Sequence, residues 1–535
     1  MAEFTQMQRD GLYQLTDSAK AQLADSKYYN EDLAPSTLAE RTWNTFHISM
    51  LWVGMAICLP SLGMAMGGVS FGLPVWASVL NVILGNAIIL VPIQLNSHSG
   101  TKYGIPFPIF SRLTFGIRGA HIPTLSRAIT ACGWNAIQSA FFGGAAIGFI
   151  IKAIFPAFND QSIPVQVVLF IVFMAACGIV TAAGSKAIRI FETFSSPLLI
   201  VLCVLLIVWA IVLASGAGYS FGQVFVTDWN PGGLSAVTYL YVFLATLTGN
   251  IAFWATMALN IPDFSRWAVS QKAQFRGQMF GMLPAMAFCA IVGAFFAQAT
   301  FLVYGEPFDN PVGVLGFLGD GVGVRVLIVI VGIGVIFATM TTNIAANIVA
   351  PANGFSNLAP HKIGYKMGTL IACLVAGIGY GIPYFYTLVY GGGFIDFMFT
   401  FLNTYGSFLA PLASIFIYDY FFVKKKNIDI ISLYKAESRY WYKGGFNMHA
   451  IIAWIAGAIL PTVAGFVPGV GGLQAHAASL YEVSAGTAVW GWIYANGYLF
   501  AFFLALLVYA LIVPRKGAPV ISDEEEKAIT DNDAA

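Results

Sequence analysis

Long apolar stretches recur along the whole chain, and they constrain its fold more than any other feature. A helix needs about 20 apolar residues to cross the hydrocarbon core of a bilayer. The 535 residues are 58% hydrophobic and only 10% charged, whereas a soluble domain carries roughly a quarter charged residues. The sequence therefore predicts an all-α integral membrane protein with about twelve transmembrane helices. We expect these helices near 44–68, 75–98, 123–152, 163–184, 190–216, 235–262, 275–303, 323–350, 365–390, 393–423, 447–470 and 489–513.

The distribution of Lys and Arg predicts the orientation of these helices, because positive residues gather in cytoplasmic loops. With twelve spans and both termini inside, all but two of the 26 Lys and Arg residues fall on the cytoplasmic side. Only Lys152 and Arg325 then lie outside. A shift of frame by one helix would destroy this asymmetry, so the sequence predicts a multi-pass protein with cytoplasmic N- and C-termini.

Several classes of protein are excluded by what the chain contains. A net charge of +1 argues against a nucleic-acid partner, which would need a basic surface. The six cysteines lie inside apolar runs and form no CxxC pair, which argues against disulfides and zinc sites. The sequence has no Ser/His/Asp constellation, HExxH motif or phosphate loop, so we expect no enzyme and no catalytic residue. Residues 1–40 and 516–535 are polar, and they are predicted to be disordered, solvated tails.

The first and sixth spans carry marks of broken helices. The first contains GMAICLPSLGMAMGG with Pro60 near mid-membrane, and the sixth contains TGNIAFWATMALNIPD with Gly249, Asn250, Asn260 and Pro262. Irregular backbone inside a membrane is tolerated where it lines a cavity. Paired breaks at corresponding places in two five-helix halves indicate an inverted-repeat transporter with a site near the midplane. The alternative is that these residues have no special role, since Gly and Pro are frequent in membrane helices.

The third span adds a polar face. Trp134 and Gln138 are four residues apart in CGWNAIQSAFFGG and lie one above the other on a helix. An indole ring stacks on planar molecules, and an amide offers both a donor and an acceptor to the edge of a ureide or pyrimidine. These residues are candidates for binding a planar heterocycle. Helix–helix packing is the alternative role for a membrane Gln.

The eighth span is the richest in polar side chains. Ala338, Thr341 and Thr342 have the spacing i, i+3, i+4, so that a carbonyl and two hydroxyls face one point. Such oxygens suit a hard cation such as sodium, and carbonyls of a broken first span would complete the site. Asn343 and Asn347 form an amide ladder on an adjacent face. Alternatively, the threonines bond back to their own helix.

Few charged residues lie at membrane depth. Asp396 is the deepest carboxylate candidate and a possible proton carrier, although a position near the outer mouth is an equal alternative. Glu192 lies close to Arg189 and is interpreted as half of an interfacial ion pair. Asp263, followed by Arg266, is interpreted as a structural cap or pair.

At these residues the chain resembles the nucleobase–cation symporter-1 family of cytosine/purine, uracil, thiamine and allantoin permeases, and in particular its bacterial sodium–hydantoin symporter branch. The resemblance covers about 40–445 and includes GTKYGIPFPIFSRLTFGIRGAHIP, NIPDFSR and the LAPLASIFIYDYFFVKKK run. It implies a leucine-transporter-type fold with a 5+5 inverted repeat and two C-terminal helices. The implied parts are a cytoplasmic tail (1–40), two repeats (41–218 and 219–424), a cytoplasmic loop with helices 11 and 12 (425–515) and an acidic tail (516–535).

The resemblance also implies a site, residue by residue. The substrate ring is sandwiched by Trp134 and Trp254, its edge is read by Gln138 and Asn347, and Asn343 is a supporting polar residue. The implied sodium ligands are the carbonyls of Gly54, Ile57 and Ala338 and the hydroxyls of Thr341 and Thr342. Two positions depart from the hydantoin branch and reshape its pocket: Cys58 replaces a Gln, and Phe253 replaces a Gly.

Together these features predict a secondary active transporter in the cell (inner) membrane that imports uracil, allantoin, hydantoin or another purine or pyrimidine base by sodium-coupled symport. We expect a small-molecule substrate and the lipid bilayer as partners, without nucleic acid or an obligate protein partner. A proton-coupled permease of the same fold, using a carboxylate such as Asp396, is the nearer alternative. A non-transporting receptor or a channel is the more distant one.

Overall fold

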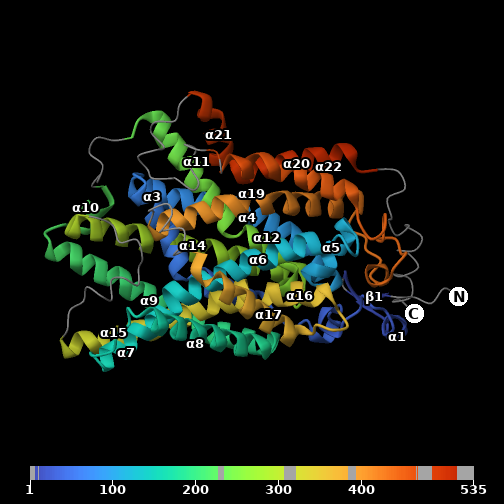
Figure 1. Cartoon of the computed structure of the whole chain (residues 1–535), viewed down its shortest axis with the longest axis horizontal. Helices are drawn as coiled ribbons and strands as arrows, with labels where there is room; N and C mark the ends of the chain where they lie inside the picture. Colours follow the sequence, from blue (N-terminus) through green and yellow to red (C-terminus); the bar gives the residue numbers. More distant parts are fainter. Residues whose placement is uncertain are drawn as a thin grey trace.

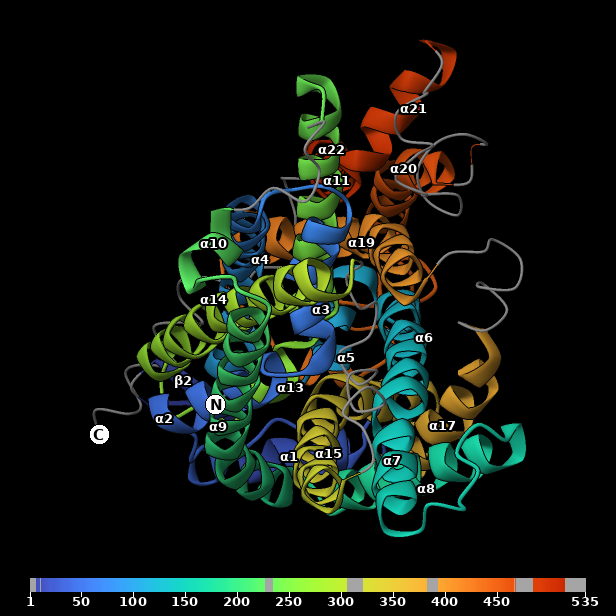
Figure 2. The ribbon, with the colours of Figure 1, turned by 90° about the vertical axis from the view of Figure 1, so that its left-hand side faces the viewer.

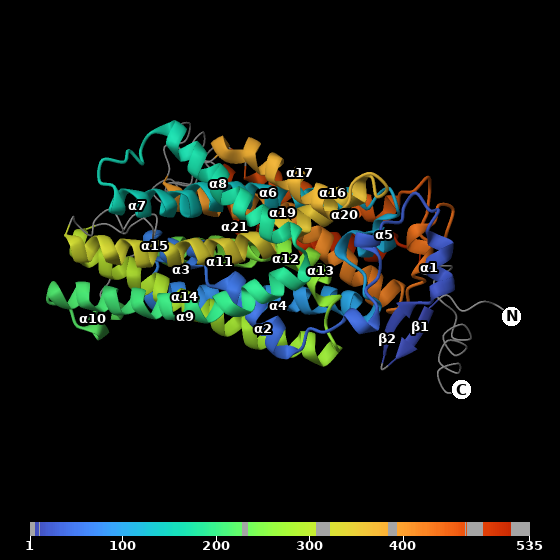
Figure 3. The ribbon, with the colours of Figure 1, turned by 90° about the horizontal axis from the view of Figure 1, so that it is seen from below.

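Nearly all of the described chain is helical, and most helices run along the long axis of the molecule (Figures 1 and 3). The computed structural model describes residues 6–9, 11–226, 234–305, 321–382, 393–465, 467 and 485–514. Eight helical stretches among them are long and apolar enough to cross a membrane. They comprise α4 (Val75–Tyr103), α6–η3–α7 (His121–Gln138, Ser139–Gly144, Ala145–Ile154), α8 (Ile163–Ala182), α9 (Ser185–Gly216), α11–α12 (Ala236–Phe253, Ala255–Asn260), α14 (Gln271–Tyr304), α15–η5–α16 (Val322–Thr342, Asn343–Ile348, Val349–Leu358) and α19–η7 (Phe394–Tyr418, Asp419–Val423).

Two further spans are bent pairs of helices. The first span consists of α2 (Thr45–Ala56) and α3 (Leu59–Ser70), which meet at 55°. The last consists of Val489–Ala495 of α21 (Ala485–Ala495) and α22 (Gly497–Ile512), which meet at 87°. The shorter helices α17 (Tyr365–Ile378) and α20 (Met448–Ala464) lie where the ninth and eleventh spans are predicted. These elements account for all twelve predicted spans, although 383–392 and 468–484 lie outside the described residues.

The predicted break in the first span is confirmed. Ile57 (φ −83°, ψ 82°) ends α2, and Cys58 (φ −141°, ψ 165°) precedes α3 in an extended conformation. Pro60 lies in the first turn of α3, where the missing N–H would have had no helical partner. The sequence therefore interrupts the helix just before Pro60 and leaves carbonyls of the end of α2 without helical donors.

The predicted break at Gly249–Asn250 in the sixth span is wrong, because both residues lie inside α11. The helix is interrupted instead at Trp254 (φ −104°, ψ 9°), between α11 and α12. Gly249 serves close packing, because a Cβ there would lie 2.6 Å from Cδ1 of Phe399 on α19. The second interruption follows Asn260, and Pro262 then opens the short helix α13 (Pro262–Ser265), as the sequence predicts.

The N-terminal segment is folded, which corrects the expectation of a disordered tail for the described part of residues 1–40. Strands β1 (Gln6–Arg9) and β2 (Leu12–Leu15) form an antiparallel hairpin, followed by α1 (Asp17–Leu23), η1 (Glu31–Leu33) and η2 (Leu38–Glu40). This segment covers one end of the bundle (Figure 3). Arg41 Nη1 donates to Thr101 O of α4 at 2.9 Å, and Asn30 Nδ2 donates to Ile363 O before α17 at 3.2 Å. Residues 516–535 lie outside the described residues.

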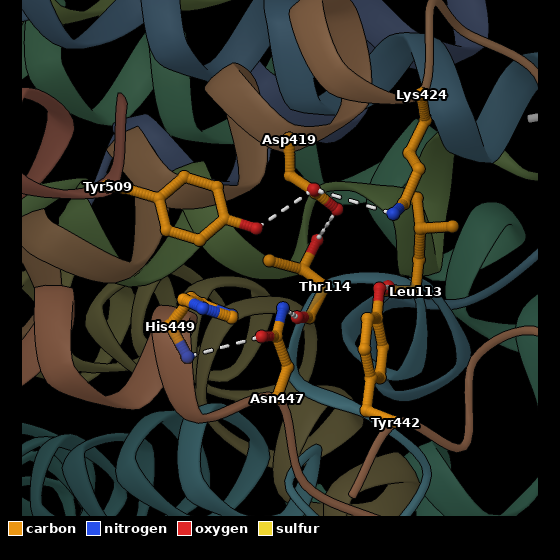
Figure 4. A network of polar contacts seen from close by, with 8 residues as sticks. All are labelled: Leu113, Thr114, Asp419, Lys424, Tyr442, Asn447, His449 and Tyr509. Atoms are coloured by element: carbon orange, nitrogen blue, oxygen red, sulfur yellow. Dashed lines mark hydrogen bonds and ion pairs between the residues drawn. The ribbon is translucent and has the colours of Figure 1, made fainter. Parts of the chain in front are cut away.

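A buried polar network ties several elements together at the same end (Figure 4). Asp419, which is fully buried, accepts hydrogen bonds from Tyr509 of α22 at 2.9 Å and from Thr114 of α5 (Phe107–Phe115) at 3.0 Å. Lys424 Nζ lies 3.9 Å from Asp419 Oδ1. Asn447 Nδ2 donates to Thr114 O at 2.6 Å. One carboxylate thus links the end of the tenth span to the segment after α4 and to the last helix.

Candidate functional site

The third and eighth spans each change from α-helix to π-helix in the middle of the molecule. The π-helical segment η3 follows Gln138 on α6, and η5 begins at Asn343 after α15. The two regions pack against each other, since α6 contacts η5 and α15 contacts η3. Single π-helical turns inside α-helices are frequent at functional sites. The predicted polar residues of both spans therefore meet at the same place.

Aromatic rings surround this place. The Trp134 ring lies 5.7 Å from the Phe253 ring at an interplanar angle of 86°, and 5.6 Å from the Phe401 ring of α19. The Trp254 ring lies 4.9 Å from Phe253 and 5.1 Å from Trp52 of α2. Phe253 therefore contacts both tryptophans of the predicted sandwich in this conformation.

The predicted amide ladder is present and extends into the third span. Asn347 Nδ2 donates to Asn343 Oδ1 at 3.0 Å. Asn343 Nδ2 donates in turn to Asn135 Oδ1 at 2.7 Å and to Ser139 Oγ at 3.1 Å. Asn135 and Ser139 were not among the predicted site residues, although Asn135 lies in the same CGWNAIQS motif. Asn343 therefore joins Asn347 of the eighth span to Asn135 and Ser139 of the third.

Four buried polar atoms near the ladder and the aromatic rings have no hydrogen-bond partner among the described residues. They are Gln138 Oε1, Trp254 Nε1, Trp52 Nε1 and Asn135 Nδ2. Gln138 and Trp254 are only 2% exposed. Buried polar groups of native proteins are normally satisfied, so each exception needs an explanation. An acceptor on the third span and a donor at the break of the sixth are the groups that a bound molecule with both an N–H and a C=O can satisfy.

A cluster of oxygen atoms joins the eighth span to the break in the first. Thr341 Oγ1 lies 2.9 Å from Gly54 O and 2.9 Å from Ala338 O. Thr342 Oγ1 lies 2.9 Å from Met55 O, 3.5 Å from Gly54 O and 3.4 Å from Ala338 O. The threonine hydroxyls bond back to their own helix, which is the alternative role of this motif, and they also bond to carbonyls of the first span. A set of carbonyl and hydroxyl oxygens fits a hard monovalent cation.

Ile57 and Cys58 lie at the break itself. Among the described hydrogen bonds, none joins the Ile57 carbonyl to the threonine hydroxyls, whereas Met55 O, which was not predicted, takes part in the cluster. Cys58 Sγ lies 3.2 Å from Ser61 Oγ of α3. The thiol therefore has a partner within the first span itself.

A buried arginine, Arg127, lies near the site, and the sequence did not predict a role for it. Arg127 of α6 donates through Nε to Thr256 O and to Asn260 Oδ1, both at 2.9 Å, and through Nη2 to Ala346 O of η5 at 2.6 Å. It thus connects the third, sixth and eighth spans. Asp263, in the short helix α13, accepts a hydrogen bond from Phe107 N at 3.0 Å.

The two remaining carboxylates of interest differ in their surroundings. The expected pair of Arg189 and Glu192 is not formed, because Arg189 Nη1 donates to Thr42 Oγ1 at 2.9 Å. Glu192 is 1% exposed, and neither of its oxygens has a hydrogen-bond partner among the described residues. Asp396 lies in the first turn of α19, beside a cavity of about 40 Å³ that Phe71 and other residues line.

The chain is similar in sequence to known permeases. The chain is 36% identical over 504 residues to the purine-uracil permease NCS1 of Arabidopsis thaliana, covering 92% of this chain and 79% of that protein. It is 31% identical over 476 residues to the allantoin permease of Bacillus subtilis (strain 168), covering 87% and 91%.

Solved structures show the same fold. The nucleobase-cation-symport-1 family transporter Mhp1, in a closed conformation with bromovinylhydantoin bound, has a TM-score of 0.71 at 24% identity and covers 94% of this chain and 99% of that one. A Na⁺-coupled sialic acid symporter has a TM-score of 0.56 at 14% identity, with 94% and 95% covered. The relatives are transporters and not enzymes. A family model for permeases of cytosine/purines, uracil, thiamine and allantoin matches residues 35–485, and the chain belongs to this family of multi-pass membrane transporters.

Proposed function

We propose that this protein imports a nucleobase or a related cyclic amide, such as uracil, allantoin, hydantoin or another purine or pyrimidine base, by sodium-coupled symport. The observation that carries the proposal is the position of Thr341 Oγ1, 2.9 Å from carbonyls of both Ala338 on its own helix and Gly54 at the broken first span. Oxygen atoms of two different helix groups meet there. A cation held by both groups favours the arrangement in which they are together.

The substrate class is supported by the unsatisfied polar atoms and the rings around them. A planar cyclic amide carries N–H and C=O groups on its edge and an apolar face. Gln138 Oε1 accepts from such an N–H, Trp254 Nε1 donates to a carbonyl, and Trp134 offers its ring face. Asn347, whose Nδ2 is held by Asn343, contributes its carbonyl oxygen. The names of the relatives, a purine-uracil permease and an allantoin permease, belong to the same chemical class.

Transport follows the alternating-access scheme, in which one group of helices rocks against the other around a central site. The two halves are residues 41–218 and 219–424, in the cell membrane with both termini in the cytoplasm. Arg127 supports this scheme, because its bonds to Thr256, Asn260 and Ala346 cross between the third, sixth and eighth spans. Opening the site toward the end that carries the N-terminal segment requires these bonds to break.

The test is a titration of intrinsic tryptophan fluorescence in the purified protein with a panel of cyclic amides, with and without sodium. We expect one compound to quench the fluorescence, sodium to increase its affinity, and Trp134→Ala to abolish the response. Trp76→Ala is the matched control, because Trp76 lies in the first turn of α4 and is 60% exposed. Coupling is reciprocal, so substrate must also raise the affinity for sodium by the same factor. Uptake that ignores sodium and collapses with a protonophore would instead favour a proton-coupled permease.

A further inference from the structure

Glu192 on α9 is the least satisfied charged side chain near the site. It is 1% exposed, and Oε1 and Oε2 both lack a hydrogen-bond partner among the described residues. Ser196, one turn further along α9, does not donate a hydrogen bond to the carboxylate. Its hydroxyl donates instead to backbone carbonyls, Glu192 O at 2.6 Å and Met50 O at 2.9 Å. A buried carboxylate without a partner is costly, so the position needs a compensating group.

The carboxylate points at the first span beside the oxygen cluster. A Cβ on Gly54 would overlap Glu192 Oε2 and would lie 3.0 Å from Ser196 Oγ. Gly54 is the residue whose carbonyl meets the hydroxyl of Thr341. Only a glycine lets the α9 carboxylate approach the α2 backbone this closely. Helices α2, α9 and α15 pack against one another, and α9 and α15 lie side by side in the end view (Figure 2).

No protein cation compensates Glu192 in the described part of the chain. Arg189, on the same helix, donates to Thr42. The other titratable or charged groups on the helices packed against α9 are His47 on α2, Cys177 on α8, Lys272, Arg276, Cys289 and Tyr304 on α14, and Arg325 on α15. None of them is hydrogen-bonded to the Glu192 carboxylate. The carboxylate therefore lies against Gly54, whose carbonyl belongs to the cluster of carbonyl and hydroxyl oxygens, and this cluster has no charge of its own.

We propose that Glu192 belongs to the cation site and supplies the negative charge that holds the coupling cation at the junction of α2, α9 and α15. This inference rests on the proposed sodium coupling and adds a residue to it. The oxygens of Gly54, Ala338, Thr341 and Thr342 are neutral dipoles. The carboxylate of Glu192 lies against the backbone of Gly54. Its negative charge would neutralise a bound monovalent cation inside the membrane, where an uncompensated charge is costly.

The experiment compares sodium dependence in four forms of the full-length protein reconstituted in vesicles: wild type, Glu192→Gln, Glu192→Asp and Arg189→Gln. Loss of a residue that supports a metal site lowers affinity by about 10- to 100-fold. We expect Glu192→Gln to raise the sodium concentration for half-maximal substrate uptake at least about tenfold, and Glu192→Asp to raise it less. At saturating sodium, substrate affinity should return to the wild-type value, which a merely structural role would not produce. Arg189→Gln should leave sodium dependence unchanged.

Binding of radiolabelled sodium to the detergent-purified proteins gives a second measurement that does not require transport. Weaker sodium binding in Glu192→Gln, with an unchanged thermal unfolding profile, is the expected result. Sodium-dependent uptake with the same sodium affinity in wild type and Glu192→Gln overturns the inference and leaves the proposed symport in place. Wild-type uptake that is indifferent to sodium, with no sodium binding, overturns both, so the two failures are distinguishable.

Discussion

The indole nitrogen of Trp134 donates a hydrogen bond to the hydroxyl of Tyr405 at 3.1 Å, and this hydroxyl lies 3.0 Å from Ala252 O in the sixth span. Tyr405 lies on α19 and is 7% exposed. The orientation of the ring proposed to stack on substrate is thus fixed by a residue more than 250 positions away, which also contacts α11 just before its break.

Removal of the Tyr405 hydroxyl should weaken substrate binding. Tyr405→Phe leaves the indole N–H and the Ala252 carbonyl without this partner, and a hydrogen bond of this kind is worth about 1 kcal/mol. We expect a several-fold higher Kd in the fluorescence titration, with normal expression. Tyr418→Phe, on the same helix, is the control and should bind like wild type. An unchanged Kd in Tyr405→Phe would show that the hydrogen bond to Tyr405 is not required to orient the Trp134 ring for substrate binding.

Truncation of Phe253 should change which substrates are accepted. Its ring lies 5.7 Å from Trp134 and 4.9 Å from Trp254, so Phe253→Ala opens space between them. We expect larger bicyclic compounds to gain affinity relative to single rings, measured by competition for uptake of one labelled substrate. Phe422→Ala removes an exposed ring at the end of the tenth span and should leave the ranking of competitors unchanged. If Phe253→Ala also keeps the wild-type ranking, Phe253 does not shape the pocket.

Removal of the hydrogen bonds between the N-terminal segment and the region before α17 should make the N-terminal segment less protected from hydrogen exchange. Asn30 Nδ2 donates to Ile363 O at 3.2 Å and also to Pro360 O, and Asp32 Oδ2 accepts from Tyr365 N at 2.7 Å. Each such bond contributes about 1 kcal/mol. In the double variant Asn30→Ala/Asp32→Ala we expect faster hydrogen exchange in residues 11–44, with little change in the membrane helices.

Asn159→Ala is the control for this experiment. It removes a local hydrogen bond to Gln161 N in an exposed loop between α7 and α8, so exchange in residues 11–44 should stay slow. Unchanged exchange in the double variant would mean that other contacts, such as that of Arg41 with Thr101, hold the segment alone.

The Asp419 network should contribute much more to stability than the partly exposed ion pair at the other end of the bundle. Asp419→Ala leaves Tyr509, Thr114 and Lys424 without their shared carboxylate (Figure 4), and loss of one member of a buried pair costs about 3–5 kcal/mol. Asp160→Ala breaks the pair with Lys152. The Asp160 side chain is only 7% exposed, but that of Lys152 is 47% exposed, so water screens the pair and it should contribute about 1 kcal/mol. Thermal unfolding in detergent should show a large drop for the first variant only. Equal drops would contradict this ranking.

The parts of the fold that depend on local pattern could be predicted from the sequence. Apolar run length gives the spans, because only helices of that length cross a bilayer. The oxygen cluster followed from the spacing of Ala338, Thr341 and Thr342, and the amide ladder from Asn343 and Asn347. These pairs lie on one helix, so their proximity depends on helical geometry alone.

The parts that depend on tertiary contacts could not be predicted. Gly249 indicates a break when it is considered alone, but it is packed against Phe399, whereas the real interruption at Trp254 carries no Gly or Pro. Glu192 was interpreted as a partner of Arg189 because the two are three residues apart. Arg189 instead donates a hydrogen bond to Thr42, which precedes the neighbouring helix α2. The N-terminal residues are mostly polar, and their order comes both from hydrogen bonds to distant loops and helix ends and from the burial of a few apolar side chains, such as Leu15, Leu23 and Leu33, in the core.

The π-helical segments η3 and η5 have a consequence for comparing this protein with its relatives. A π-helical turn accommodates one additional residue, and one residue corresponds to a rotation of about 100° in an α-helix. Both segments lie in the third helix of a five-helix half, so the same register shift occurs twice. Deletion of Ala345 from η5 would rotate the residues that follow it by about 100° relative to those that precede it. A relative that lacks one residue in either segment therefore presents different side chains to its pocket, even where every flanking residue is identical.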